Sequence, residues 1–124
     1  MISRRKVVIC GSFKQDLLAL EKLYQKLSEL QCTIISPLSL DFAISDRGFV
    51  KSMQDKAFSN LDIENHHLRS IAFADDIWIH APNGYLGAST CFEIGYALAL
   101  NKPIYCQEII DDPTLKEYIT LREL

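Results

Sequence analysis

Short apolar runs alternate with amphipathic stretches along this 124-residue chain. Each run is apolar almost throughout, which is typical of strands covered on both faces of a sheet. Over residues 17–30, leucines recur at three- and four-residue steps with charged residues mostly opposite, and this period predicts an amphipathic helix. The predicted strands are residues 6–10, 33–36, 76–80 and 104–106.

Capping and stop signals predict three further helices. One is expected over residues 61–73, with Ser59 or Asn60 as its cap, and a nearly uncharged one at about residues 91–100. A last short helix is expected to begin at Pro113, because proline suits the first helical turn. Between the second strand and the helix at 61–73 the sequence shows no sustained period, and there we expect a loop followed by a short helix at residues 50–58.

Strands that alternate with helices predict one α/β domain over residues 1–124. The expected fold is flavodoxin-like or Rossmann-like, an open parallel sheet of four to five strands with helices on both faces. Ligands of such sheets bind beyond the carboxyl ends of the strands, where the strand order reverses. If the first strand is central, residues 11–14 and 83–90 are the two loops that face this crevice.

Composition narrows the kind of partner. The net charge of -3 gives no reason to expect a nucleic acid polymer or an anionic membrane as a partner. No apolar run is long enough for a membrane span, and no signal peptide is recognisable. The four cysteines are widely spaced with no CxxC pair, so we expect buried free thiols in a cytoplasmic protein and no metal site. They are Cys10, Cys32, Cys91 and Cys106.

Small residues gather in the two crevice loops. Glycines there let the backbone approach a ligand, and a helix N-terminus behind them favours an anion such as a phosphate. The spacing matches neither a Walker loop nor the dinucleotide GxGxxG, so a plain capped turn is the alternative. The candidate binding residues are Gly11, Ser12, Gly84, Gly87, Ser89 and Thr90.

Glu93 is the only carboxylate in the second loop and the first turn of its helix. With Thr90 as N-cap it would complete a capping box, which contributes roughly 1 kcal/mol. The surrounding helix is apolar and lies beside the crevice, so we favour a desolvated functional carboxylate. Gly95 in the same helix predicts close packing on the sheet or on another subunit, which would make this helix part of an interface.

Two pairs of polar residues have mainly structural interpretations. His66 and His67 are neighbours on a helix, point about 100° apart and cannot readily share a metal. Solvated histidines are the simpler interpretation, although His67 could face the crevice. Asp75 and Asp76 enter the third strand at the edge of the sheet away from the ligand loops, where a structural role is expected.

Three segments resemble the nucleoside 2-deoxyribosyltransferases and the related 5′-monophosphate N-glycosidases. They are CGSF at residues 10–13, FADDIWI at 73–79 and GYLGASTCFEIGYALALNKPIY at 84–105. The resemblance implies that Glu93 is a nucleophile that attacks the anomeric carbon and forms a glycosyl-enzyme ester, resolved by water or a second base. It also implies that Ser12 and residues 87–89 hold a 5′-phosphate, and that the chain forms dimers or larger homo-oligomers.

The chain departs from the family at three positions. His67 stands where the family usually has an aspartate that orients the substrate and supplies a proton, and we hypothesise that His67 takes over proton donation. Val8 replaces a tyrosine of several monophosphate hydrolases. Gly87 stands where the transferases have an aspartate, six residues before the glutamate.

The sequence therefore predicts an enzyme that cleaves the N-glycosidic bond of a nucleoside or (deoxy)nucleoside 5′-monophosphate without a cofactor. Hydrolysis is favoured over base exchange, because the loops suit a phosphate and the C-terminus is shorter than that of the transferases. The alternative is a nucleotide-binding or sensor module without turnover. Phe13, Phe42 and Phe49 are candidates to stack on the base.

Overall fold

The computed structural model describes residues 4–38 and 59–124. Its core is a five-stranded sheet in the order β2-β1-β3-β4-β5, with every neighbouring pair parallel. This order is the flavodoxin-like arrangement, in which the strand order reverses between β1 and β3. The predicted fold class is confirmed. The strands are β1 (Lys6–Gly11), β2 (Thr33–Ser36), β3 (Asp76–His80), β4 (Ile104–Cys106) and β5 (Thr120–Leu121).

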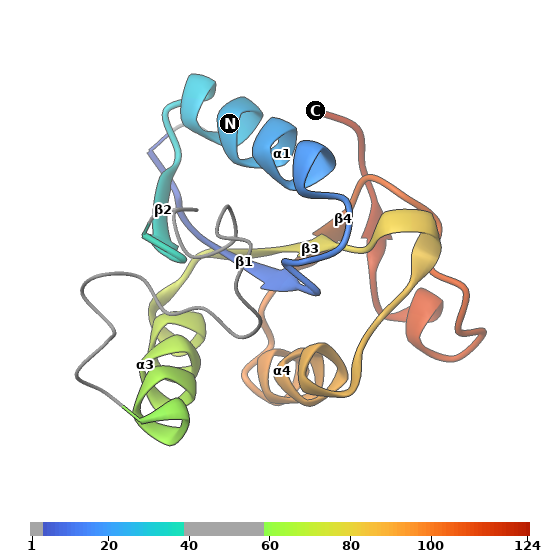
Figure 1. The fold of residues 1–124 in the computed structure, drawn as a ribbon. Coiled ribbons are helices and arrows are strands. Elements are labelled where there is room, and N and C mark those ends of the chain that lie inside the picture. Colours follow the sequence, from blue (N-terminus) through green and yellow to red (C-terminus); the bar gives the residue numbers. More distant parts are fainter. Residues whose placement is uncertain (1–3, 39–58) are drawn as a thin grey trace.

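The helices form a layer on each face of the sheet. Figure 1 shows α1 on one face, and α3 and α4 side by side on the other. Ser59, one of the two predicted caps, is the N-cap of α3, and it forms a full capping box with Asp62. Two single turns of 3₁₀-helix, η1 (Pro82–Gly84) and η2 (Leu115–Glu117), join the later elements. The α-helices are α1 (Leu17–Glu29), α3 (Asn60–Phe73) and α4 (Ala88–Ala99).

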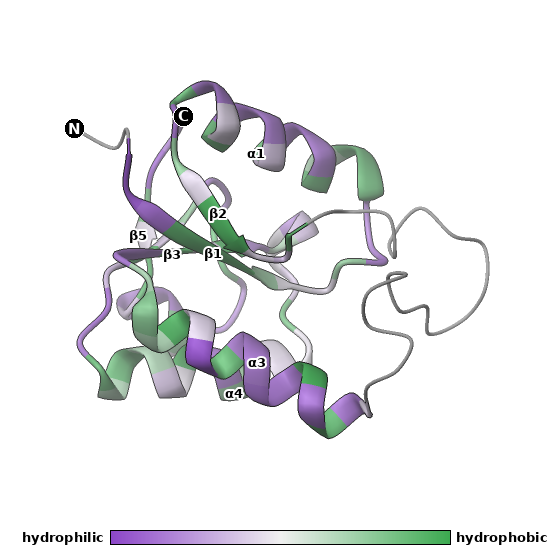
Figure 2. Ribbon diagram, turned by 90° about the vertical axis from the view of Figure 1, so that its left-hand side faces the viewer, coloured by the Kyte–Doolittle hydropathy of each residue, from purple (hydrophilic) through white to green (hydrophobic). Residues whose placement is uncertain are grey.

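The alternation of side chains along β1 divides the core into two layers. Val7 and Ile9 pack with the leucines of α1 and with Trp78 of β3. Val8 and Cys10 point to the other face, toward α3 and α4. Figure 2 shows hydrophilic and hydrophobic residues alternating along α1, as expected for a helix with one face on the sheet. The buried β1 side chains that reach the α3/α4 side are therefore those of Val8 and Cys10.

The two aspartates at the start of β3, Asp75 and Asp76, have structural roles, as predicted. Asp76 is 2% exposed and receives two hydrogen bonds from the Arg5 guanidinium, of 2.5 and 3.0 Å. Asp75 accepts a hydrogen bond of 2.9 Å from the backbone N–H of Lys6. These contacts hold the start of β1 beside the start of β3, and the two parallel strands stay paired up to their carboxyl ends at the opposite end of the sheet.

The start of α4 differs from the prediction. The helix begins at Ala88 rather than near Cys91, with Gly87 in an extended conformation as its N-cap. Thr90 lies inside the first turn, is 2% exposed and caps nothing. The predicted capping box between Thr90 and Glu93 is therefore wrong, because glycine, which also tolerates the cap position, precedes the hydroxyl residues. Glu93 has no capping role.

Two other predictions are corrected. The short helix expected from Pro113 is a 3₁₀ turn followed by β5, whose two residues pair with Tyr105 and Cys106 of β4 and cover its edge. Gly95 does not pack closely on the sheet, since a Cβ built there meets no atom within 4 Å. The predicted helix at residues 50–58 lies outside the described residues, as do Phe42 and Phe49.

No helix in the described ranges, 4–38 and 59–124, has the length and apolar character that a membrane span requires.

Candidate functional site

The two predicted ligand loops meet at the point where the strand order reverses. Gly11 ends β1 so close to β3 that a Cβ would lie 2.3 Å from the carbonyl oxygen of His80, which excludes alanine. Ser12 follows, and a Cβ on Gly87 would lie 3.1 Å from the Ser12 Oγ atom. Ser89 is exposed in the first turn of α4. The glycines thus bring the β1 loop and the N-terminus of α4 together.

Other predicted binding residues have structural roles. Gly84 is buried with a φ of +78°, and a Cβ would lie 2.6 Å from the carbonyl oxygen of Ile109 and 2.8 Å from the Asp111 Oδ1 atom. Its glycine is needed for packing against that segment. Thr90 is buried in α4, and Phe13 packs partly against the α1-side cluster. These three positions offer less to a ligand than the sequence suggests.

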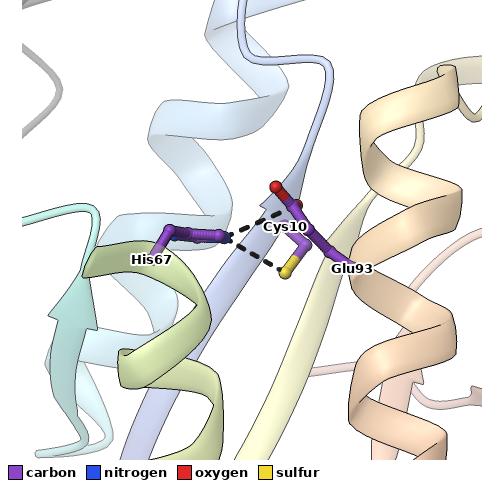
Figure 3. A group of neighbouring side chains, drawn as sticks. All are labelled: Cys10, His67 and Glu93. Carbon is purple, nitrogen blue, oxygen red and sulfur yellow. Dashed lines mark hydrogen bonds and ion pairs between the residues drawn. The ribbon is translucent and has the colours of Figure 1, made fainter. Parts of the chain in front are cut away.

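Beside the loops, three side chains from three elements converge. Figure 3 shows Cys10 from β1, His67 from α3 and Glu93 from α4 pointing toward one another. The His67 Nε2 atom lies 3.4 Å from the Cys10 Sγ atom and 3.5 Å from the Glu93 Oε1 atom. The Glu93 residue is 7% exposed. The two predicted catalytic residues, Glu93 and His67, are therefore in contact.

The His67 ring is held from behind. Its Nδ1 atom lies 2.6 Å from the hydroxyl of Ser36, the last residue of β2. With Nδ1 engaged by Ser36, Nε2 is directed at Cys10 and Glu93. His66 is exposed, so the interpretation of both histidines as solvated is wrong for His67 and right for His66.

A second carboxyl group completes the site. Glu64 lies on α3 one turn before His67, and its carboxyl group interacts electrostatically with that of Glu93. Burial, the hydrogen bond to Glu93 and the Glu93 charge together raise the pKa of Glu64 to about 8. Burial also opposes ionisation of Glu93, but hydrogen bonds from His67 and Glu64 outweigh it and hold the pKa of Glu93 below its ordinary value.

At neutral pH the pair therefore consists of an ionised Glu93 and a protonated Glu64. Two neighbouring carboxyl groups with separated pKa values can act as a nucleophile and an acid. Cys10 does not compete as a nucleophile, because burial and the Glu93 charge raise the pKa of its thiol well above the ordinary value.

The ligand atoms of Cys10, His67 and Glu93 lie within 4.8 Å of one another, a spacing that could also surround one metal ion. In this structure their contacts are with one another, and we describe the group as a hydrogen-bonded set.

Three residues of this site escaped the sequence analysis, namely Cys10, Ser36 and Glu64. Cys10 reads as one more apolar position in a buried strand, and only the alternation along β1 relates it to the α3/α4 face. Ser36 ends a strand where a polar residue is ordinary. Glu64 could have been found from its three-residue spacing to His67, which places both on one helix face.

Comparison with known structures agrees with this fold. The chain matches a solved structure described as a 2-deoxyribosyltransferase from the psychrotolerant bacterium Bacillus psychrosaccharolyticus, a biocatalyst for the synthesis of nucleosides. The match has a TM-score of 0.62 and covers 95% of this chain and 86% of that one, with 19% sequence identity. No protein family matches the sequence, and no curated protein does. The likeness shows that this chain has the fold of a 2-deoxyribosyltransferase.

Proposed function

We propose that this protein cleaves the N-glycosidic bond of a nucleoside or nucleoside 5′-monophosphate, with Glu93 as the nucleophile. The observation that carries this proposal is the state of Glu93. It is a nearly buried carboxylate, kept ionised by its neighbours, at the switch point of a sheet with this fold. The sequence resemblance around Glu93 and the 2-deoxyribosyltransferase neighbour support the same chemistry.

The reaction has two steps. In the first, a Glu93 oxygen bonds to the anomeric carbon while the bond from that carbon to the base nitrogen breaks, and the electron pair and one proton go to the departing base. In the second, water or another base attacks the same carbon, releases the sugar from Glu93 and gives up one proton.

His67 holds the nucleophile in place. The Nδ1 atom of its ring faces Ser36, and the Nε2 atom faces Glu93 and Cys10. Because both nitrogens are already engaged inside the site, we assign His67 to positioning Glu93, in place of the proton donation that the sequence suggested.

The phosphate end of the substrate fits the N-terminus of α4. No side chain in the described part of the protein caps this helix, so its first backbone N–H groups are available to an anion. Ser89 is exposed in that turn, and Ser12 approaches Gly87 at its start. These contacts favour a 5′-monophosphate over a free 5′-hydroxyl, and we therefore place hydrolysis ahead of base exchange.

A binding module without turnover is the second candidate. The observation in its favour is His67, which stands in place of the family aspartate. A structural explanation of Glu93, which would favour this candidate, is weaker than the sequence suggested, because the capping box with Thr90 does not form.

The test is release of free base, measured by chromatography. Wild type, Glu93→Gln and the control Glu21→Gln are incubated with ribo- and deoxyribonucleosides and their 5′-monophosphates, with and without a second base. Glu21 is an exposed carboxylate on α1, across the sheet from the site. We expect release by wild type and by the control, and none by Glu93→Gln, because an amide cannot form the ester.

The acceptor decides between the two reactions. Free sugar phosphate as the product supports hydrolysis, whereas a new nucleoside formed only with the added base supports transfer. If no protein releases base but a nucleotide raises the melting temperature of wild type and Glu93→Gln alike, the enzyme proposal is wrong and the binding module stands.

A further inference from the structure

The reaction above needs a proton for the departing base, and one carboxyl group in the site has no assigned task. Glu64 lies one helical turn before His67 on α3, on the helix side that packs against α4, and its carboxyl group interacts electrostatically with that of Glu93. Its Oε1 atom is buried and has no hydrogen-bond partner among the described residues. A buried carboxyl group in this position must be explained, since an unpaired polar atom costs about 1–3 kcal/mol.

We propose, on the basis of the function proposed above, that Glu64 is the acid that donates its proton to the departing base. The reacting centre is the anomeric carbon next to Glu93, so a carboxyl group that interacts with Glu93 lies close to that centre. Glu64 is partly exposed, whereas Cys10 is fully buried behind it. Because its side chain is partly exposed, Glu64 can turn from Glu93 toward a bound base.

The chemistry of the pair links the two events. Before the reaction, burial of the carboxyl group and the negative charge on Glu93 keep Glu64 protonated. When Glu93 becomes an ester it loses that charge, so Glu64 releases its proton more readily at the moment the base needs one. In the second step the Glu64 carboxylate takes the proton from the attacking water or base, and the starting state returns.

The direct test compares two leaving groups. A purine methylated at N7 departs from its nucleotide as a neutral base without gaining a proton, whereas guanine requires one. We measure base release from guanosine 5′-monophosphate and its N7-methylated counterpart by wild type, Glu64→Gln, Glu64→Asp and Glu93→Gln, with deoxyribose forms in parallel. Glutamine keeps the size of Glu64 and a hydrogen-bond donor for Glu93 but supplies no acidic proton.

We expect Glu64→Gln to lose about 10²–10⁴-fold in turnover of the unmethylated substrate and little on the methylated one. Glu64→Asp should restore part of the loss. Equal losses on both substrates, or no loss on either, would overturn the proposal, because a structural role does not distinguish the leaving groups. Failure of the proposed function would look different. Wild type and Glu93→Gln would then release base equally from each substrate, and the proposed role of Glu64 would be wrong as well.

The pH profile of kcat/KM is an independent test of the role of Glu64. For the unmethylated substrate, kcat/KM of wild type should fall as pH rises through about 8, as Glu64 loses its proton. The other ionisable groups that face Glu64 in the described structure are Glu93 on α4, His67 on α3 and Cys10 on β1. The alkaline fall should be absent for the methylated substrate. A fall that persists there would assign it to one of those neighbours.

Discussion

Replacing Gly95 by alanine tests what lies on the outer face of α4. Gly95 is exposed in the middle of the helix, and a Cβ built there meets no atom of the described residues within 4 Å. The added methyl group therefore disturbs no contact among residues 4–38 and 59–124. Alanine also restricts the unfolded chain more than glycine does, so the substitution should stabilise the protein.

The expected gain follows from the helix propensity alone. Glycine is about 0.8–1 kcal/mol less favourable than alanine inside a helix, and nothing at Gly95 offsets that difference. We expect the free energy of unfolding to rise by about 0.5–1 kcal/mol, which for a domain of this size raises Tm by about 2–4 °C. Gly11→Ala is the matched control, because its Cβ would lie 2.3 Å from the His80 carbonyl oxygen and must destabilise.

The assay is urea unfolding followed by circular dichroism at two protein concentrations at least tenfold apart. A rise in the midpoint with an unchanged m-value at both concentrations supports the reasoning. A loss of stability relative to wild type at the higher protein concentration, which disappears on dilution, would refute it, since another copy of the chain would then cover Gly95. Phe92, which is 59% exposed, and Leu100, which is 40% exposed, would be the apolar neighbours in that interface.

Two further predictions concern the site. Ser36→Ala removes the hydroxyl group that contacts the His67 Nδ1 atom. The lost hydrogen bond is worth about 0.5–1.5 kcal/mol, so kcat should fall by about 2–10-fold. Ser28→Ala, at an exposed serine, is the control, and unchanged turnover of Ser36→Ala would mean that other contacts hold the ring. The raised pKa of Glu64 makes folding stability depend on pH, because the folded state keeps a proton that the unfolded chain releases from about pH 4.5. That contribution is fully present below pH 4.5 and is lost as pH rises through about 8, so wild type should lose more stability between pH 5 and pH 9 than Glu64→Gln, and parallel urea midpoints would contradict the assignment.

The sheet was predictable because its strands are continuous apolar runs with clear stops. Four strands lie where the apolar pattern puts them, and Ser59 caps α3 through local hydrogen bonds that sequence spacing expresses directly. The fifth strand was not visible. A strand of only Thr120 and Leu121 carries no period, and it exists because the edge of β4 needs a hydrogen-bonding partner.

The site was predictable only in part. Glu93 could be found because a lone carboxylate in an apolar helix is unusual, but its partners come from a helix that reads as polar and solvated. His67 and Glu64 gain their character from burial against α4 and β1, a property of the packed layers rather than of the α3 sequence. The start of α4 failed for a local reason, since Ser89 and Thr90 resemble caps while the backbone of Gly87 takes that position.

The single tryptophan lies on the face of the sheet that the site does not use. Trp78 is fully buried with the α1 leucines, and its ring centroid is 5.2 Å from that of Tyr105. An indole enclosed in apolar surroundings emits at short wavelength, and its emission shifts to the red when unfolding exposes it to water. A ligand between α3 and α4 should leave that emission unchanged, because the sheet separates the two. Tryptophan fluorescence should therefore report global unfolding without responding directly to a ligand in the site. A ligand that raises the melting temperature measured by fluorescence would do so through folding stability alone.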